Sequence, residues 1–237
     1  MPLFKSHKIQ TGNVCLKVLF LILWFPFYLH GEEKEMQTRK PVAATAAKIC
    51  PAQEGTKIPA AFIKTIAGTN VSLSAIIAQK PTVLIFYSGG WCPYCNLQLE
   101  QLQKIEKQLV NLGYQIVALS ADRPEKLQET SQNKKINYRL FSDSAMNAAQ
   151  ALGIAFHVDD VTVDKYKKFG LDIEEASGEK HHLLPVPAAF VLKTDGTVVF
   201  AYVNPDYKVR VQPEVLLAAA KAALKKGSII KKRKLKK

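Results

Sequence analysis

Two cysteines separated by two residues, Cys92 and Cys95, are the side chains of this chain best suited to chemistry. They follow an apolar run, residues 82–87, and precede a segment with helical periodicity. A thiol at a helix N-terminus has a lowered pKa, because unpaired backbone N–H groups and the helix dipole stabilise the thiolate. The pair therefore predicts redox chemistry at sulfur.

The segment after the first cysteine should form a helix over residues 93–112. Its apolar residues recur at helical spacing, which places on one face Cys95, Leu99, Leu102, Ile105 and Leu109. Pro93 suits the first turn, and Gly113 suits the stop. We therefore expect Cys92 to cap the helix as the ionised, reactive thiol. Cys95 should lie beneath it as the resolving thiol.

Other uses of the two thiols are disfavoured. Structural zinc takes four ligands, and the remaining cysteines, Cys15 and Cys50, form no second pair. The adjacent His181 and His182 lie in a polar stretch and are expected to face solvent. A purely structural disulfide would close a loop too small to restrain the unfolded chain. We expect no metal, and we leave Cys50 as either an idle thiol or a third partner that relays oxidation.

The charge of the chain lies at its ends. Of the net +13, residues 1–31 contribute +3 and residues 225–237 contribute +8, which leaves +2 for the middle. A nearly neutral body argues against a nucleic-acid partner. The basic segment 226–237 is expected to be a disordered tail. It serves either solubility or a weak contact with an anionic membrane.

The N-terminus has the composition of an export signal. Basic residues precede the apolar run 18–29, and acidic residues follow from Glu32. The run is short for a membrane span and suits a signal peptide, although its aromatic residues also suit an anchor. Residues 1–31 are thus expected to be a signal peptide or an N-terminal membrane anchor. The chain would be exported, to a periplasmic or other extracytoplasmic location.

Residues 32–58 lack periodicity and are expected to be a linker, followed by one domain over residues 59–225. Strands are expected at residues 60–66, 71–73, 82–87, 115–120, 138–141, 188–192 and 197–202. Helices are expected at residues 93–112, 124–132, 144–152 and 213–225. Strand, helix and strand over residues 82–120 predict a right-handed parallel unit, hence an α/β fold. Residues 157–184 are expected to be irregular.

Two stretches resemble a known family. Residues 86–99, FYSGGWCPYCNLQL, resemble the peroxiredoxin-like branch of the alkyl hydroperoxide reductase/thiol-specific antioxidant family. Residues 184–192, LPVPAAFVL, and the following Asp195-Gly196 are similar to the strand and hairpin that face its active site. The resemblance covers residues 55–225. It implies a single-domain thioredoxin-like fold, with a central mixed β-sheet flanked by helices.

The resemblance also implies a reaction and its supporting residues. The substrate would be a hydroperoxide, the electron donor would be a thioredoxin-like dithiol, and no cofactor would be needed. The supporting residues would be Gly89, Gly90, Trp91, Pro93, Pro187 and Arg210. Pro187 would be a cis-proline packed against the thiols, and Arg210 would lie near the thiolate.

Two positions depart from the related patterns. Typical peroxiredoxins carry threonine or serine three residues before the peroxidatic cysteine, where this chain has Gly89. Thioredoxins carry a buried acid six residues before the first cysteine, where this chain has Phe86. We expect the backbone amides of Gly89 and Gly90 to replace the missing hydroxyl as donors.

Three functions remain open from the sequence. The first is a thiol-dependent peroxidase, an antioxidant in which Cys92 becomes a sulfenic acid and Cys95 condenses with it to a disulfide. The second is an exported thiol–disulfide oxidoreductase, in which the same pair exchanges with protein disulfides. The third is a protein that holds a soft ion such as Cu(I) on both thiols.

Overall fold

The computed structural model describes residues 40–234, with side chains as far as Lys225. The described residues belong to one compact unit. The segment predicted as a signal or anchor, residues 1–31, lies outside them, as does Cys15. Among the residues described, no helix has the length and apolar character needed to cross a bilayer.

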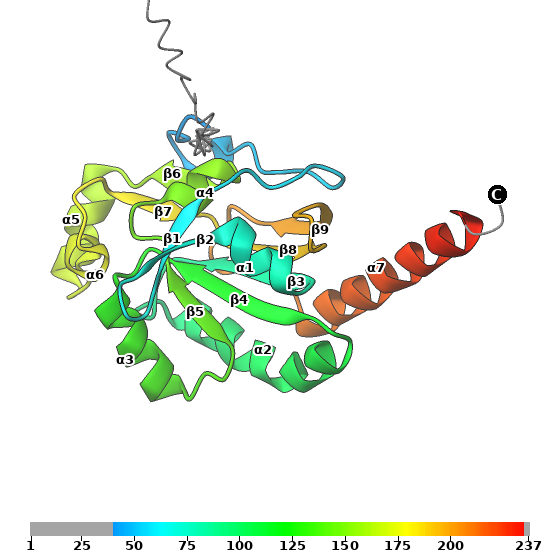
Figure 1. Ribbon diagram of the computed structural model, residues 1–237. Coiled ribbons are helices and arrows are strands. Elements are labelled where there is room, and N and C mark those ends of the chain that lie inside the picture. The colour runs from blue at the N-terminus through cyan, green and yellow to red at the C-terminus, as the bar shows by residue number, and fades with distance from the viewer. Residues whose placement is uncertain (1–39, 235–237) are drawn as a thin grey trace, which may run out of the picture. The chain divides into compact units, whose positions relative to one another are not determined.

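In the described residues, a seven-stranded mixed sheet forms the centre of the fold (Figure 1). Its strands, from one edge to the other, are β2 (Asn70–Ser72), β1 (Phe62–Thr65), β5 (Arg139–Ser142), β4 (Gln115–Ser120), β3 (Thr82–Tyr87), β8 (Ala188–Leu192) and β9 (Val198–Val203). β3, β4 and β5 run parallel, and β8 pairs with β3 in the antiparallel sense. This arrangement confirms the predicted mixed sheet.

The central strand β3 is buried along its whole length. Successive side chains of a strand point to opposite faces. Val83, Ile85 and Tyr87 accordingly pack into one apolar layer, while Leu84 and Phe86 pack into the other. The strand therefore ends in the middle of the molecule, and the turn that follows it carries the cysteines.

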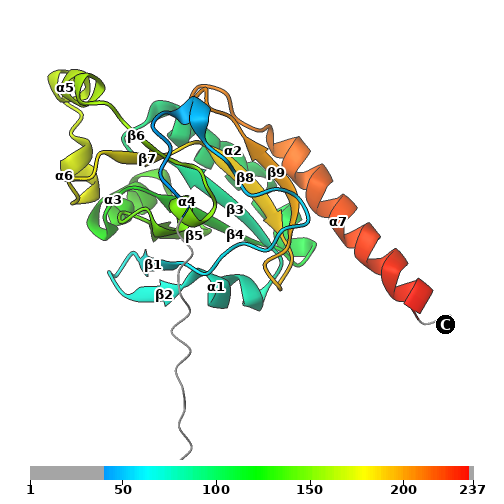
Figure 2. The ribbon, with the colours of Figure 1, turned by 90° about the horizontal axis from the view of Figure 1, so that it is seen from above.

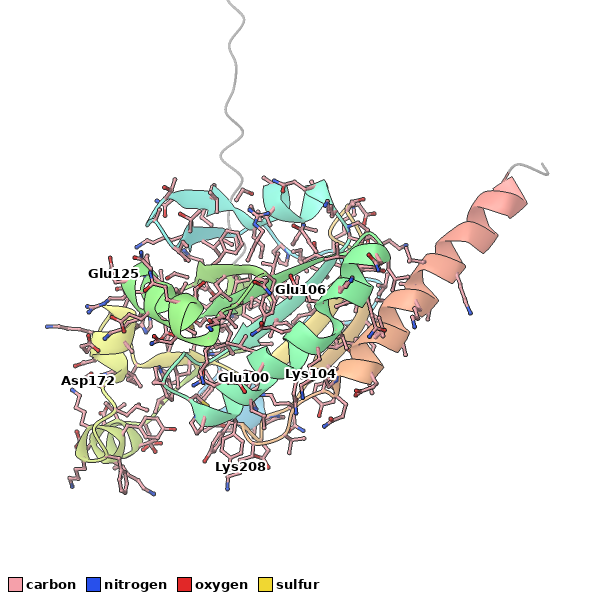
Figure 3. All side chains as sticks on the ribbon, turned by 90° about the horizontal axis from the view of Figure 1, so that it is seen from below. Glu100, Lys104, Glu106, Glu125, Asp172 and Lys208 are labelled. Carbon is pink, nitrogen blue, oxygen red and sulfur yellow. The ribbon has the colours of Figure 1, made fainter. Side chains whose placement is uncertain are left out.

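Helices cover both faces of the sheet (Figure 2). One face packs against α2 (Pro93–Asn111), α3 (Pro124–Lys134) and α7 (Pro213–Lys234). The opposite face packs against α1 (Leu73–Gln79) and α4 (Asn147–Ala151). The outer face of α2 carries the exposed Glu100 and Lys104 (Figure 3), so the helix has the two-sided character that its sequence predicts.

Helix α1 was not predicted. Its segment is short and mixes small and apolar residues, so its periodicity is weak. The Ser72 hydroxyl caps it by accepting a hydrogen bond from Ala75 N–H at 3.4 Å. Burial of Leu73, Ile76 and Ile77 against the sheet then stabilises a helix that local propensity alone would not specify.

Residues 157–184 are more regular than expected. Two antiparallel strands, β6 (Ala155–His157) and β7 (Leu183–Pro185), form a second sheet. Between them lie α5 (Asp160–Lys168) and α6 (Ile173–Ser177), side by side in Figures 1 and 2. The side chain of Asp159 caps α5, and the side chain of Asp172 caps α6. Short helices with weak periodicity explain why the sequence pattern missed them.

The linker interpretation is wrong for residues 40–58. This segment contains a short 3₁₀ helix, η1 (Ala46–Lys48), and hydrogen bonds to the β6 region. Ala43 N–H donates to Ala155 O at 3.1 Å, and Ala52 N–H donates to Leu152 O at 2.9 Å. Backbone pairing of this kind leaves no periodic side-chain pattern, so composition alone did not reveal it.

The C-terminal helix is also longer than expected. α7 continues to Lys234, beyond its predicted end at Lys225. The interpretation of residues 226–237 as a disordered tail is therefore wrong up to Lys234. Lysine, isoleucine and arginine all tolerate a helix, and only Gly227 disfavours it. Residues 235–237 lie outside the described part.

Candidate active site

The two thiols lie at the start of α2, where β3 delivers the chain into a tight turn. Cys92 is the N-cap residue and Pro93 occupies the first turn, as predicted. Cys92 N–H donates to Gly89 O at 3.2 Å, and Asn96 N–H donates to Cys92 O at 3.0 Å. Both cysteines are free thiols. Cys92 is 4% exposed and Cys95 is fully buried, so the predicted order of burial is present but the difference is small.

Arg210 lies against the inner thiol. Its Nη2 donates to Cys95 Sγ at 3.6 Å. The same guanidinium donates through Nη1 to the carbonyl oxygens of Tyr207 and Val209. The loop before α7 thus holds the cation in place, and its charge favours a thiolate at Cys95. The family resemblance implied that Arg210 lies near the thiolate, which was expected to be Cys92, whereas the contact in the structure is with Cys95.

The negative charge therefore lies on the sulfur that was not expected to carry it. The pKa of Cys95 is lowered to about 6, first by the hydrogen bond from the Cys92 thiol and then by the charge of Arg210. The pKa of Cys92 is raised, first because its thiol donates that hydrogen bond and then because it is buried. One proton is shared within the pair. Both pKa shifts run against the prediction that Cys92 is the ionised thiol, because the hydrogen bond from the Cys92 thiol and then the charge of Arg210 favour the thiolate on Cys95.

The outer thiol nevertheless lines an open cavity. Cys92 lines a cavity of about 440 Å³, together with Trp91, Pro93 and Pro187. Two pairs of aromatic residues line this cavity. The ring centroids of Trp91 and Tyr166 are 6.3 Å apart, and those of Tyr94 and Tyr207 are 5.6 Å apart in an edge-to-face contact. We call this cavity the cysteine groove. Cys95 does not line it, so Cys92 is the sulfur that a substrate in the groove reaches first.

The Gly90 amide does not serve the thiols as expected. Gly90 N–H donates to Asp122 Oδ2 at 2.7 Å, and Gly90 O accepts from Asn96 Nδ2 at 2.8 Å. The Gly90 amide is therefore not free to bind a peroxide. A Cβ on Gly89 would lie 2.5 Å from Asp122 Oδ1, so the close approach of this carboxylate requires glycine there.

Asp122 is the residue that sequence reasoning missed. It is 1% exposed, and burial raises its pKa to about 7. It lies just beyond β4, at the carboxyl end of a strand parallel to β3. Carboxyl ends of neighbouring parallel strands meet at one edge of the sheet, where ligands and reactive groups gather. That rule, applied to the predicted strand 115–120, is the signal that would have found it.

The remaining candidates lie elsewhere. His181 Nε2 contacts Ser144 O at 2.7 Å and His182 Nε2 contacts Glu174 Oε1 at 2.8 Å, so both rings are engaged rather than free in solvent. Within the described residues, no group of three or more metal-binding side chains is present. Cys50 is exposed and lines neither the cysteine groove nor the cavity beside Asp122.

Known proteins share this arrangement of elements. The chain is 27% identical over 114 residues to peroxiredoxin Q of Suaeda salsa chloroplasts, which is 48% of this chain and 53% of the relative. It is 25% identical over 104 residues to peroxiredoxin Bcp of Escherichia coli, or 44% of this chain and 66% of the relative. The chain thus matches less than two thirds of the length of these relatives.

A solved structure agrees with the fold. Reduced Prx3 of Vibrio vulnificus, in complex with hydrogen peroxide, superposes with a TM-score of 0.59 at 18% identity. The superposition covers 71% of this chain and 99% of that one. At this identity the likeness supports the thioredoxin-like fold alone. Residues 55–201, which include β3, both thiols and β8, match the family described as AhpC/TSA. The chain belongs to the AhpC/TSA family.

Proposed function

We propose that this protein is a thiol-dependent peroxidase in which Cys92 attacks the hydroperoxide and Cys95 first acts as a base and then resolves the product. Membership of the AhpC/TSA family and the peroxiredoxin relatives support the reaction class. One observation carries the roles: Cys92 opens to the cysteine groove while Arg210 holds the charge on Cys95.

The first step joins these two features. The Cys95 thiolate accepts the proton of the Cys92 thiol, and the Cys92 sulfur attacks the terminal oxygen of the hydroperoxide. The O–O bond breaks, Cys92 becomes a sulfenic acid, and the alkoxide leaves as an alcohol after it takes a proton. Cys95 lies one helical turn after Cys92 and accepts its proton directly, so no separate histidine is required as the base.

The second step closes the pair. Cys95 attacks the Cys92 sulfenic acid, water leaves, and a Cys92–Cys95 disulfide forms. An external dithiol of the thioredoxin type then reduces the disulfide by exchange. None of these steps requires a metal or an organic cofactor. Because its walls are largely apolar and aromatic, the cysteine groove favours an organic hydroperoxide over hydrogen peroxide.

A second candidate function has one observation in its favour. The cysteine groove contains Pro187 and the outer thiol together and has room for more than a small peroxide. An extended peptide beside Cys92 would let the same pair act as a disulfide reductase on protein substrates.

Stopped-flow mixing of the reduced full-length chain with cumene hydroperoxide or hydrogen peroxide tests the proposal. We expect disulfide formation orders of magnitude faster than oxidation of a free thiol. Cys92→Ser should abolish it. Cys95→Ser removes both the base and the resolving thiol, so a sulfenic acid should form on Cys92 more slowly than in the wild type and then persist, where a dimedone probe would label it. Cys50→Ser is the matched control for removal of a thiol and should react at the wild-type rate.

Three outcomes would contradict the proposed peroxidase mechanism. A rate no faster than that of a free thiol would remove the peroxidase. A sulfenic acid on Cys95 in the Cys92→Ser variant would reverse the roles of the two sulfurs. Rapid insulin reduction with slow peroxide reduction would favour the second candidate.

A further inference from the structure

Four polar side chains converge beneath the first turn of α2, inside an apolar layer. They are Tyr87 at the end of β3, Cys95 on the inner face of α2, Ser120 at the end of β4, and Asp122 just beyond it. Each is 1% exposed or less. Burial of polar groups costs free energy unless they are paired, so a cluster of this kind needs a physical explanation.

The cluster contains two unsatisfied atoms. Tyr87 Oη and Asp122 Oδ1 have no hydrogen-bond partner of good geometry in the described residues. The Ser120 hydroxyl nonetheless lies close enough to both groups to lower the pKa of each. The other carboxylate oxygen, Oδ2, accepts the Gly90 N–H at 2.7 Å. The carboxylate is therefore fixed by the turn that precedes Cys92, with one oxygen free.

The Asp122 side chain lies within electrostatic reach of Cys95 and also lines a second cavity. Asp122 lines a surface cavity of about 440 Å³, together with Asn96, Lys126 and Thr130. Neither Cys92 nor Cys95 lines this cavity. On its inner side, Asp122 is close enough to Cys95 for the thiolate charge to raise the carboxyl pKa. The side chain thus connects the buried sulfur to solvent by a path separate from the cysteine groove.

We propose that Asp122 stores a proton for the thiol pair, taking it up when the disulfide is reduced and releasing it when the pair is oxidised. The inference rests on the proposed cycle of Cys92 and Cys95. Asp122 does not touch the peroxide, so it is a positioning residue for protons rather than a catalytic one.

The proton balance of the cycle closes with this store. The reduced site holds one proton shared by the two sulfurs and one on Asp122. Reaction with one hydroperoxide gives the disulfide, one alcohol and one water, and it consumes both site protons. The two electrons come from the sulfurs, and the external dithiol returns them together with two protons. Without Asp122, the second proton would have to come from solvent at every turnover.

The charges around Asp122 support a change in its pKa between the reduced and the oxidised site. The pKa of Asp122 is raised chiefly by burial, lowered by the Gly90 N–H, and raised by the Cys95 thiolate. Tyr87 on β3 and Cys95 on α2 face it from the core, while Lys126 on α3 lowers its pKa. Other charged residues line the same cavity: Glu129, Lys134, Asp172 and Glu175. Oxidation removes the thiolate charge and so lowers the pKa of the Asp122 carboxyl from its value in the reduced site, while burial continues to raise it; this change favours release of the proton.

Proton uptake on reduction tests the proposal without any peroxide. The full-length disulfide form is reduced with a chemical dithiol in weak buffer, and protons taken up per disulfide are measured from about pH 6 to about pH 9. The dithiol itself releases two protons per disulfide reduced, and these are added to the measured change to give the uptake by the protein. We expect that uptake to be about two protons just below pH 7 and about one well above it. Asp122→Asn keeps an acceptor for Gly90 N–H, and it should take up about one proton throughout. Asp143→Asn, which removes a buried carboxylate that caps α4, is the matched control and should behave as wild type.

Infrared difference spectra of the unmodified chain give a second readout. Reduction near pH 7 should produce the C=O band of a protonated carboxyl group, and oxidation should remove it. Unchanged proton uptake in Asp122→Asn, or no such band in the wild type, would overturn the proposal. A chain that forms no Cys92–Cys95 disulfide at all would instead show that the proposed function is wrong.

Discussion

At the residue scale, the negative charge of the site and its opening to the cysteine groove belong to different sulfurs. The thiolate is stabilised on Cys95 by Arg210, and the opening to the groove is at Cys92. A buried thiolate is protected from unwanted alkylation and oxidation, and it becomes useful only when its neighbour gives up a proton. In the proposed reaction, this division lets Cys92 act as the nucleophile at neutral pH although its pKa is raised.

Removal of the arginine should raise the pKa of the pair. In Arg210→Met, the midpoint of thiolate absorbance against pH should rise by about one pH unit or more, because the cation within reach of Cys95 is lost. Arg210→Lys keeps the charge and should shift the midpoint less. An unchanged midpoint in Arg210→Met would show that the hydrogen bond from Cys92 alone stabilises the thiolate.

Burial of Asp122 should make stability depend on pH. With a folded pKa of about 7 against an ordinary value of 3.8, the folded chain holds a proton that the unfolded chain has lost. Its contribution to the free energy of unfolding is therefore present below about pH 4 and is lost as the pH rises toward 7. Relative to wild type, Asp122→Asn should gain on the order of a few kcal/mol between about pH 4 and about pH 8.

Urea unfolding of the reduced wild type and of Asp122→Asn, at both ends of this pH range, checks the prediction. Asp143→Asn again serves as the comparison, because its carboxylate accepts the Ala148 and Ala149 N–H groups. A difference between Asp122→Asn and wild type that does not change with pH would contradict the assigned ionisation.

At the element scale, the turn between β3 and α2 is held against α3. A Cβ on Gly90 would lie 2.0 Å from Thr130 Oγ1, which is closer than two unbonded atoms can approach. Glycine at this position therefore lets α3 pack onto the turn, and the Gly90–Asp122 hydrogen bond fixes the same turn to the end of β4. The position of the thiols is set by three elements rather than by α2 alone.

This packing predicts a coupled pair of substitutions. Gly90→Ala should destabilise the fold by about 1–3 kcal/mol through overpacking. Gly90→Ala combined with Thr130→Ala should recover part of that loss, since the nearest contact is removed. Thermal unfolding of both single variants and the double variant gives the coupling energy. Simple additivity of the two effects would show that the turn moves away from α3 freely.

At the scale of the whole molecule, the segment before the predicted domain completes the fold. Residues 40–58 bury Ala52 and Ile58 in the layer that also contains α1 and α4. Ala44, Thr45 and Ala46 line the cysteine groove. This N-terminal segment therefore contributes both to stability and to the wall of the site.

Truncation measures the contribution of residues 40–58 to stability. A chain that begins at residue 59 should be less stable than one that begins at residue 40 by roughly 2–5 kcal/mol, because buried apolar contacts and backbone hydrogen bonds are lost. Urea midpoints of the two chains provide the measurement. Equal midpoints would restore the interpretation of residues 40–58 as a linker.

The sequence by itself determined the parts of the fold that have strong local patterns. The buried run 82–87, the helical face from Cys95 to Leu109 and the Asp195-Gly196 turn specified β3, α2 and the β8–β9 hairpin. Binary patterning is read from neighbouring residues, so it predicts such elements well. The location of Cys92 at the cap followed for the same reason. Export of the chain stays a prediction, since its signal lies outside the described residues.

Only the tertiary structure decided the electrostatics of the site. Arg210 and Asp122 are distant from the thiols in sequence, and no local pattern shows that one contacts Cys95 or that the other occupies the Gly90 amide. The pKa of a group depends on burial and on charges within a few ångströms, and these are properties of packing rather than of spacing along the chain. For that reason the spacing of residues singled out the two sulfurs as candidates, but it did not show that Arg210 favours the thiolate on Cys95.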